Sequence, residues 1–202
     1  MIWLNEFEHL ALLIFAITPV MLGGIVNMVW VKAPYGKVLN KPIDGGRCLD
    51  DGQRVLGNNK TWKGFLGMIV ITGFFNVLYH FIVMNSHYLH GINVLILNDH
   101  WFPLSSFAIG ALLGFAYVLA ELPNSFVKRR IHIEPGKNSK GLKGIIFTLL
   151  DQSDSVIGCA VVYFLITDLS WIDVFIMILI GSFLHYLVNI LLYCLGLKAQ
   201  AR

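Results

Sequence analysis

The chain has 202 residues, of which 56% are hydrophobic and 13% are charged, and its formal net charge is +3. A soluble domain carries about 25% charged residues, so this composition excludes an ordinary soluble protein and indicates an integral membrane protein. Five charge-poor apolar stretches approach the roughly 20 residues that cross a bilayer, and they cover about residues 9–31, 64–84, 104–120, 144–166 and 172–195. We therefore predict an all-α integral membrane protein, a bundle of five transmembrane helices that forms a single membrane domain over residues 1–202.

All fifteen Lys and Arg residues fall on one side of such a bundle. They lie in the first connection (residues 32–63), the third connection (residues 121–143) and the C-terminal tail. The positive-inside rule then places the N-terminus outside and the C-terminus in the cytoplasm, with long cytoplasmic loops between helices 1 and 2 and between helices 3 and 4. Acids crowded beside bases on the same face suggest a metal–phosphate site. These acids are Asp44, Asp50, Asp51, Glu121, Glu134, Asp151 and Asp154.

The first span carries Thr18-Pro19 and Gly23-Gly24, which predict a kink or a close helix contact. The connection that follows is over 30 residues long and is rich in Gly, Asp and Asn. Loops of that length are usually functional or disordered, and the mixture of Pro42, Trp62 and both charge signs favours an ordered functional loop. Its GQRVLGNNKT segment lacks the Gly directly before Lys that a Walker A phosphate loop requires, so we reject that assignment.

The third span carries Gly110 and Gly114, a spacing typical of close helix packing. Pro123 is predicted to end this helix, and Asn124 or Ser125 to cap a new one. The segment that follows would then be a separate helix in the third connection.

Three consecutive bases, Lys128, Arg129 and Arg130, lie in the segment ELPNSFVKRR. Clustered Lys and Arg beside Ser and Asn suit phosphate binding. Three bases just inside a span are also what topology anchoring requires, so both interpretations stay open. Neighbouring positions on a helix point about 100° apart, so we expect only one of the two Arg side chains to face a site.

The fourth span contains two acids, Asp151 and Asp154, which are three residues apart and therefore share a helix face. A charge at the centre of a membrane helix costs about 2.5–3.5 kcal/mol, so two such acids need water, a metal ion or bases around them. Alternatively, the span begins at Ser155 and the acids cap its N-terminus, where the helix dipole favours them. That span would be short, which favours a site recessed below the headgroups.

The fifth span carries His185 and Asn189, four residues apart on one face of an apolar helix, and interhelical hydrogen bonding is their expected role. One alternative function is a small transporter or channel with an intramembrane polar path through Asp151, Asp154 and His185. The apolar SVIGCAVVYFLI segment after Asp154 argues against it. Another alternative is a structural subunit whose bases only bind anionic lipid, but it gives no reason for paired acids beside the bases.

Four segments together resemble the CDP-archaeol synthase family, which is related to the phosphatidate cytidylyltransferases. They are PIDGGRCLDDGQRVLGNNKTWKG, NSFVKRR, LLDQSDSVIG and HYLVNILLYCLGLK, which span residues 42–198 in the family's order and near its spacing. The family also has five membrane helices. Two departures are present: Ala120-Glu121 stands where members usually carry Gly-Asp, and the chain ends in KAQAR where many members have Asp and aromatic residues.

The resemblance implies an enzyme that transfers CMP from CTP to a membrane lipid phosphate. The products would be pyrophosphate and a CDP-lipid of the CDP-archaeol or CDP-diacylglycerol type. It also implies Mg²⁺ as cofactor, with CTP, the lipid phosphate and the bilayer as partners and no nucleic acid. A phosphomonoester has a second pKa of about 6, so its oxygen is already a nucleophile, and the site has only to position and neutralise a triphosphate.

The site residues that the resemblance implies fall into three sets. The metal ligands would be Asp151, Asp154 and Glu121. The catalytic residues would be Asp151, Asp154, Lys128 and Arg129. The substrate-binding residues would be Asp44, Arg47, Lys60, Thr61, Lys63, Asn124, Ser125 and Arg130.

Overall fold

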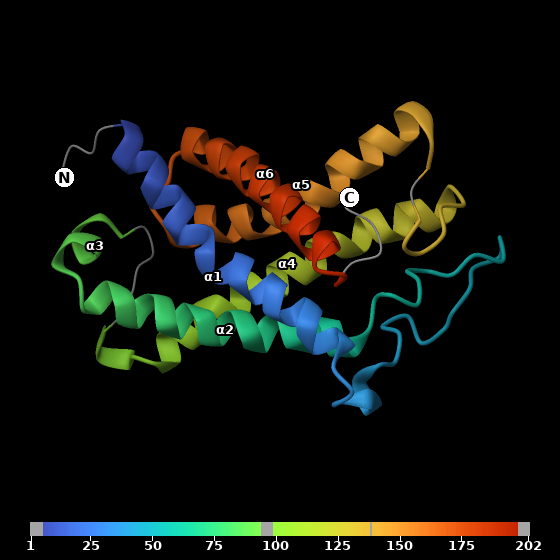
Figure 1. The fold of residues 1–202 in the computed structure, drawn as a ribbon, viewed down its shortest axis with the longest axis horizontal. Helices are drawn as coiled ribbons and strands as arrows, with labels where there is room; N and C mark the ends of the chain where they lie inside the picture. The colour runs from blue at the N-terminus through green and yellow to red at the C-terminus, as the bar shows by residue number, and fades with distance from the viewer. Residues whose placement is uncertain (1–5, 94–98, 138, 198–202) are drawn as a thin grey trace.

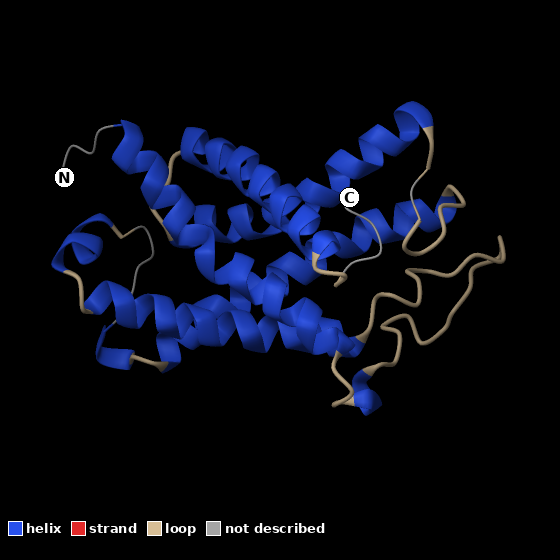
Figure 2. Cartoon of the chain, viewed as in Figure 1, coloured by secondary structure: helices blue, strands red, loops and turns tan. Residues whose placement is uncertain are grey.

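A computed structural model describes residues 6–93, 99–137 and 139–197 (Figure 1), and in these ranges the chain consists of helices and loops (Figure 2). The long helices are α1 (Glu6–Lys32), α2 (Trp62–Met84), α4 (Leu104–Arg130), α5 (Gly141–Ile166) and α6 (Trp171–Cys194). All five are long and apolar enough to cross a membrane, which confirms the predicted all-α bundle of five candidate spans. The basic tail residues Lys198 and Arg202 lie outside the described residues.

Successive connections alternate between the two ends of the bundle (Figure 1). One end, which we call the basic end, holds the first connection with the short helix η1 (Lys37–Leu39), the link between α4 and α5, and the end of α6. The opposite end holds the start of α1, the short helices α3 (His87–Ile92) and η2 (Asp99–Trp101), and the link between α5 and α6. The two basic connections therefore lie at one end, as the sequence predicts.

Glycine residues let α2 pack closely against α1 and α4. A Cβ added to Gly110 would lie 2.6 Å from the carbonyl oxygen of Thr72, and one added to Gly114 would lie 2.6 Å from the carbonyl oxygen of Met68. Real Cβ atoms do not approach an oxygen that closely, so only Gly fits at these two positions. A Cβ added to Gly23 of α1 would clash with the side-chain hydroxyl of Thr72 in α2. These contacts confirm the predicted packing roles of both glycine motifs.

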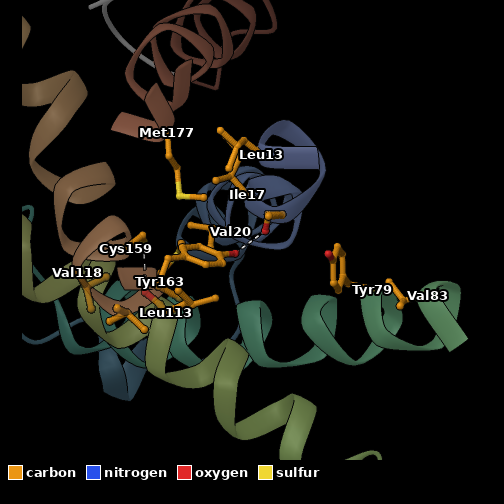
Figure 3. Close-up of a cluster of buried hydrophobic side chains, with 13 residues drawn as sticks. Leu13, Ile17, Val20, Tyr79, Val83, Leu113, Val118, Cys159, Tyr163 and Met177 are labelled. Carbon is orange, nitrogen blue, oxygen red and sulfur yellow. Dashed lines mark hydrogen bonds between the residues drawn. The ribbon is translucent and has the colours of Figure 1, made fainter. Parts of the chain in front are cut away.

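Apolar side chains from all five long helices form a packed core (Figure 3). Tyr163 of α5 is fully buried there, and its hydroxyl donates a hydrogen bond to the carbonyl oxygen of Ala16 in α1. In lipid, such packing and interhelical hydrogen bonds drive helix association, because the bilayer gives no hydrophobic driving force between helices. The buried residues of α5 beyond Ser155 are Cys159, Ala160, Val162 and Tyr163. This mainly apolar interior argues against a transport path that continues from the acids to the opposite end.

The prediction that Pro123 ends the third helix is wrong. Helix α4 continues through Pro123 to Arg130. A proline removes one backbone hydrogen bond, and membrane helices tolerate this because neighbouring groups satisfy the freed carbonyl. Asn124 and Ser125 therefore do not cap a new helix, and Lys128 belongs to the last turn of α4.

The alternative in which Asp151 and Asp154 cap a helix that begins at Ser155 is also wrong. Helix α5 begins at Gly141, so the two acids lie about three turns inside it. From Asp151 to Ile166 the helix rises about 22 Å, compared with about 30 Å for the hydrocarbon core of a bilayer. The acids therefore lie well inside a helix that is long and apolar enough to cross a membrane.

The orientation of the bundle in the membrane stays a prediction from the Lys and Arg distribution. Cys48 is exposed in the first connection, and His90 is exposed at the opposite end. In intact cells we expect an impermeant maleimide to label a His90→Cys variant and to leave native Cys48 unlabelled, with the other cysteines of each variant replaced by Ser. After lysis both positions should react. Labelling of Cys48 but not of the His90→Cys variant in intact cells would show that the bundle has the opposite orientation.

Candidate active site

A polar cavity of about 680 Å³ lies at the basic end, between the long helices and the first connection. Its basic lining residues are Lys32, Lys60, Lys128, Arg129 and Lys137. Its acidic lining residues are Glu121, Asp151 and Asp154. The cavity has the size of an ordinary small-molecule site, and its excess of bases over acids suits a polyanionic ligand.

Close packing of α4 against α5 brings the intramembrane acids to their partners. A Cβ added to Gly158 of α5 would lie 2.6 Å from the Cβ of Ala120 in α4, so this Gly lets the two helices approach. Positions four residues apart share one face of a helix. Asn124 and Lys128, one and two turns beyond Ala120, therefore face α5 near the acids, and this alignment requires that α4 continue through Pro123.

Two side chains of α4 bind the acids of α5. The amide nitrogen of Asn124 donates hydrogen bonds of 2.7 Å to Asp151 and of 2.7 Å to Asp154. The ammonium group of Lys128 donates to both carboxylate oxygens of Asp151. The structure thus gathers four predicted site residues into one cluster.

A second ion pair joins α4 to the first connection. Lys60, which precedes α2, donates a hydrogen bond to the carboxylate of Glu121. Burial by itself lowers the pKa of Lys60, but Glu121 and the nearby Asp154 and Asp151 raise it above its ordinary value. Lys60 is therefore a permanent cation beside three carboxylates.

Arg129 lines the cavity, and part of its guanidinium has no hydrogen-bond partner among the described residues. Only 5% of its surface is exposed, and its Nε and Nη1 have no hydrogen-bond partner among the described residues. Burying a charged group with unsatisfied N–H donors is costly, because no hydrogen bond replaces its lost hydration. Such a group is therefore expected where a ligand supplies the acceptors. A guanidinium fork matches phosphate oxygens through two parallel hydrogen bonds.

Arg130, in contrast, ties the end of α4 to the first connection. Its guanidinium donates a 2.7 Å hydrogen bond to Asp51 and further hydrogen bonds to the carbonyl oxygens of Gln53 and Arg54. It also lies 5.2 Å from the ring of Phe126. The helix register thus directs one Arg into the cavity and the other onto the loop, as expected for neighbouring helical positions.

Asp44 organises the first connection from within rather than lining the cavity. Its carboxylate accepts hydrogen bonds from the guanidinium of Arg54 and from the backbone N–H groups of Gly46, Leu56 and Gly57. Burial raises the pKa of Asp44, but these donors outweigh burial and lower the pKa to about 2. The stabilisation from this depressed pKa is complete above the unfolded-state pKa of about 3.9 and is lost as the pH falls through about 2.

Lys63, predicted to bind substrate, lies away from the cavity wall. It is fully buried, and its ammonium group donates to the carbonyl oxygens of Val31 at 3.2 Å and Ala33 at 2.7 Å. It also lies 4.9 Å from the centre of the Trp30 ring. These contacts satisfy carbonyl groups at the end of α1, so Lys63 fixes the junction between α1 and α2.

The remaining predicted substrate-binding residues differ in position. Thr61 and Ser125 line the cavity. Thr61 also caps α2, because its hydroxyl oxygen accepts a hydrogen bond from the N–H of Gly64 at 3.3 Å. Arg47 is exposed in the first connection. Lys60, Thr61, Asn124 and Ser125 thus share the cavity, whereas the side chains of Asp44, Arg47, Lys63 and Arg130 are not among its lining residues.

An apolar cavity of about 90 Å³ adjoins the polar one, and Tyr117, His185 and Asn189 line both. The ring nitrogens of His185 lie 3.2 Å from the carbonyl oxygen of Gln152 and 3.3 Å from the hydroxyl of Tyr117. Asn189 donates a 2.7 Å hydrogen bond to the side chain of Gln152. These contacts confirm the predicted interhelical bonding. Sequence reasoning missed Tyr117, because one Tyr inside an apolar span carries no distinctive signal.

The acids of this cluster fit a magnesium ion chemically. Asp151 and Asp154 present carboxylate oxygens to a single amide nitrogen between them, and the side-chain oxygen of Asn124 is buried without a partner among the described residues. Mg²⁺ prefers oxygen ligands and keeps part of its shell for water and phosphate. Among the described residues, no three ligand side chains are already gathered around one point. Glu121 as a third ligand therefore stays a prediction.

Comparisons with known proteins agree with this architecture. A sequence profile of the CarS-like CDP-archaeol synthase family matches residues 10–201. The CDP-archaeol synthase of Thermofilum pendens is 30% identical over 187 residues, which cover 85% of this chain and 78% of that protein. That of Methanocaldococcus jannaschii is 33% identical over 161 residues, covering 78% of this chain and 81% of that protein. A solved structure of an intramembrane enzyme for archaeal membrane lipid biosynthesis shares the fold, with a TM-score of 0.61 at 23% identity, and the match covers 92% of this chain and 95% of that one.

Proposed function

Because the chain belongs to the CDP-archaeol synthase family, we propose that it transfers CMP from CTP to the phosphate of an archaeol-type isoprenoid ether lipid. The products are a CDP-lipid and pyrophosphate. The Thermofilum pendens and Methanocaldococcus jannaschii relatives are CDP-archaeol synthases, which favours the archaeol type over the diacylglycerol type. The observation that carries the proposal is the guanidinium of Arg129, whose Nε and Nη1 have no hydrogen-bond partner among the described residues, together with the Lys128–Asp151–Asp154 cluster in a cavity rich in bases.

The two adjoining cavities suit the two substrates. The polar cavity opens at the basic end, where CTP would enter from the cytoplasm, and its lysines and Arg129 would neutralise the triphosphate. The apolar cavity is lined by residues of α1, α5 and α6 together with Tyr117 of α4, and it would accept part of the lipid. Tyr117 and His185 line both cavities, so the lipid phosphate would meet the nucleotide near these two residues.

The reaction needs no base from the protein. An ionised oxygen of the lipid phosphate attacks the α-phosphorus of CTP and forms a new P–O bond. The bond from the α-phosphorus to the bridging oxygen of the β-phosphate breaks, and pyrophosphate leaves with the electron pair. When bound, Mg²⁺ would neutralise charge on the phosphates. Asp151 and Asp154, with Glu121 as a further candidate, would hold it, while Arg129 and Lys128 orient phosphate oxygens.

The assay is CTP-dependent pyrophosphate release by the purified protein in nanodiscs. The acceptors to compare are an isoprenoid ether lipid phosphate, a diacyl phosphatidate and a polyprenyl phosphate. We expect release with the ether lipid to exceed that with the other two acceptors by at least about tenfold, a difference of about 1.4 kcal/mol. Faster release with phosphatidate would overturn the lipid assignment. An absence of CTP-dependent release with every acceptor would overturn the proposed function.

A further inference from the structure

The carboxylates that would hold the metal ion are already bound by cationic or N–H groups of the protein. Lys128 donates to both oxygens of Asp151, and Asn124 bridges Asp151 and Asp154. The Lys128 and Asp151 side chains are only 12% and 27% exposed, so little water screens this pair. A divalent cation that approaches Asp151 must therefore displace an ammonium group or bear its repulsion.

Lys60 likewise forms an ion pair with Glu121, the third candidate metal ligand. The two side chains are 19% and 23% exposed, and the ammonium group donates directly to the carboxylate. Both lysines have flexible four-carbon stems, and both line the cavity that is proposed to receive the triphosphate. An ammonium group that leaves its carboxylate for a phosphate oxygen exchanges one anionic partner for another, so it is not left unpaired.

We propose that Lys128 and Lys60 are counter-ions that occupy the metal-binding carboxylates, and so keep a metal ion from binding them, until the nucleotide arrives. The inference rests on the proposed function, because it assumes that the cavity receives a metal–nucleotide complex. The phosphates of CTP attract the two ammonium groups, and the carboxylates then become free to bind the metal ion. The nucleotide-free protein therefore binds a divalent cation weakly, and each ligand strengthens the binding of the other by the same factor.

The test is the affinity of the nucleotide-free, full-length protein for Mn²⁺, measured by electron paramagnetic resonance of the free ion. We expect Lys128→Gln to bind Mn²⁺ at least about tenfold more tightly than wild type, and Lys60→Gln to show a smaller gain. Lys128→Arg keeps the charge and should not show this gain. The matched control is Lys137→Gln, because Lys137 also lines the cavity but is paired with Glu134 at 2.7 Å. Its affinity should stay within about twofold of wild type.

Three outcomes would overturn the inference. The first is Mn²⁺ binding no tighter than wild type in both Lys→Gln variants of the ion pairs, each checked for folding by size exclusion. The second is an equal gain in the Lys137→Gln control, which would reduce the effect to general electrostatics. The third is wild-type Mn²⁺ affinity in Asp154→Asn, which would also remove the metal from the proposed site. If Asp154→Asn abolishes binding while the lysine variants do not tighten it, the proposed function stands and only the counter-ion role fails.

Discussion

Replacing Asp154 by Asn is expected to lower kcat/KM by at least about a thousandfold, close to 4 kcal/mol of transition-state stabilisation, in a protein that stays inserted and folded. Asn keeps the volume of the side chain and removes the charge that a metal ion needs. Asn124 can still donate a hydrogen bond to the new carboxamide oxygen, so the contact between α4 and α5 survives. Asp151→Asn should have a similar effect, because Asp151 is the other proposed metal ligand and the same charge is removed.

Asp168→Asn is the matched control for these two variants. Asp168 lies in the link between α5 and α6, at the opposite end of the bundle from the cavity. The same Asp-to-Asn change there should leave the rate of CTP-dependent pyrophosphate release at the wild-type level. Near-normal rates in both Asp151→Asn and Asp154→Asn would show that the carboxylates have a structural role and would rule out the metal role.

The spans and their grouping at two ends could be predicted from sequence because these signals are summed over many residues. A run of about 20 apolar residues is needed to cross a bilayer, and all fifteen bases of the sequence fall in alternate connections and the C-terminal tail, a pattern that no single residue can reverse. The two acids of α5 were predictable for a related reason, since ionised groups inside a membrane helix are costly and need a partner or a function.

Single-residue geometry was less predictable. Pro123 indicated a helix end, but the effect of a proline depends on whether neighbours satisfy one freed carbonyl, which the sequence does not show. Lys63 is of a residue type that often binds phosphate, and only the fold reveals that the carbonyl groups of Val31 and Ala33, at the end of α1, lie within its reach. The choice between Arg129 and Arg130 required the register of α4, and that register depends on the continuity of the helix through Pro123.

Arg129→Lys is expected to lower kcat/KM at least about tenfold, near 1.4 kcal/mol. The guanidinium lines the cavity with two nitrogen atoms free of partners among the described residues. Lys keeps the charge but offers a point charge instead of a planar fork, so it cannot reproduce two parallel hydrogen bonds to a phosphate. If Arg129 only anchored the orientation of the bundle, charge alone would matter and the kcat/KM of the variant would equal that of wild type.

Arg130→Lys is the matched comparison, because the same exchange one position along α4 changes a loop contact instead of a cavity contact. Arg130 binds Asp51 and two backbone carbonyl groups of the first connection. We expect a protease to cleave the first connection of this variant faster than that of wild type during limited proteolysis. Its kcat/KM should stay within about threefold of wild type, since a surface ion pair is worth about 1 kcal/mol or less. Arg129→Lys should show the reverse: a slower reaction with unchanged proteolysis. Wild-type kinetics in Arg129→Lys would return the basic segment to an anchoring role and leave the nucleotide phosphates without their guanidinium ligand.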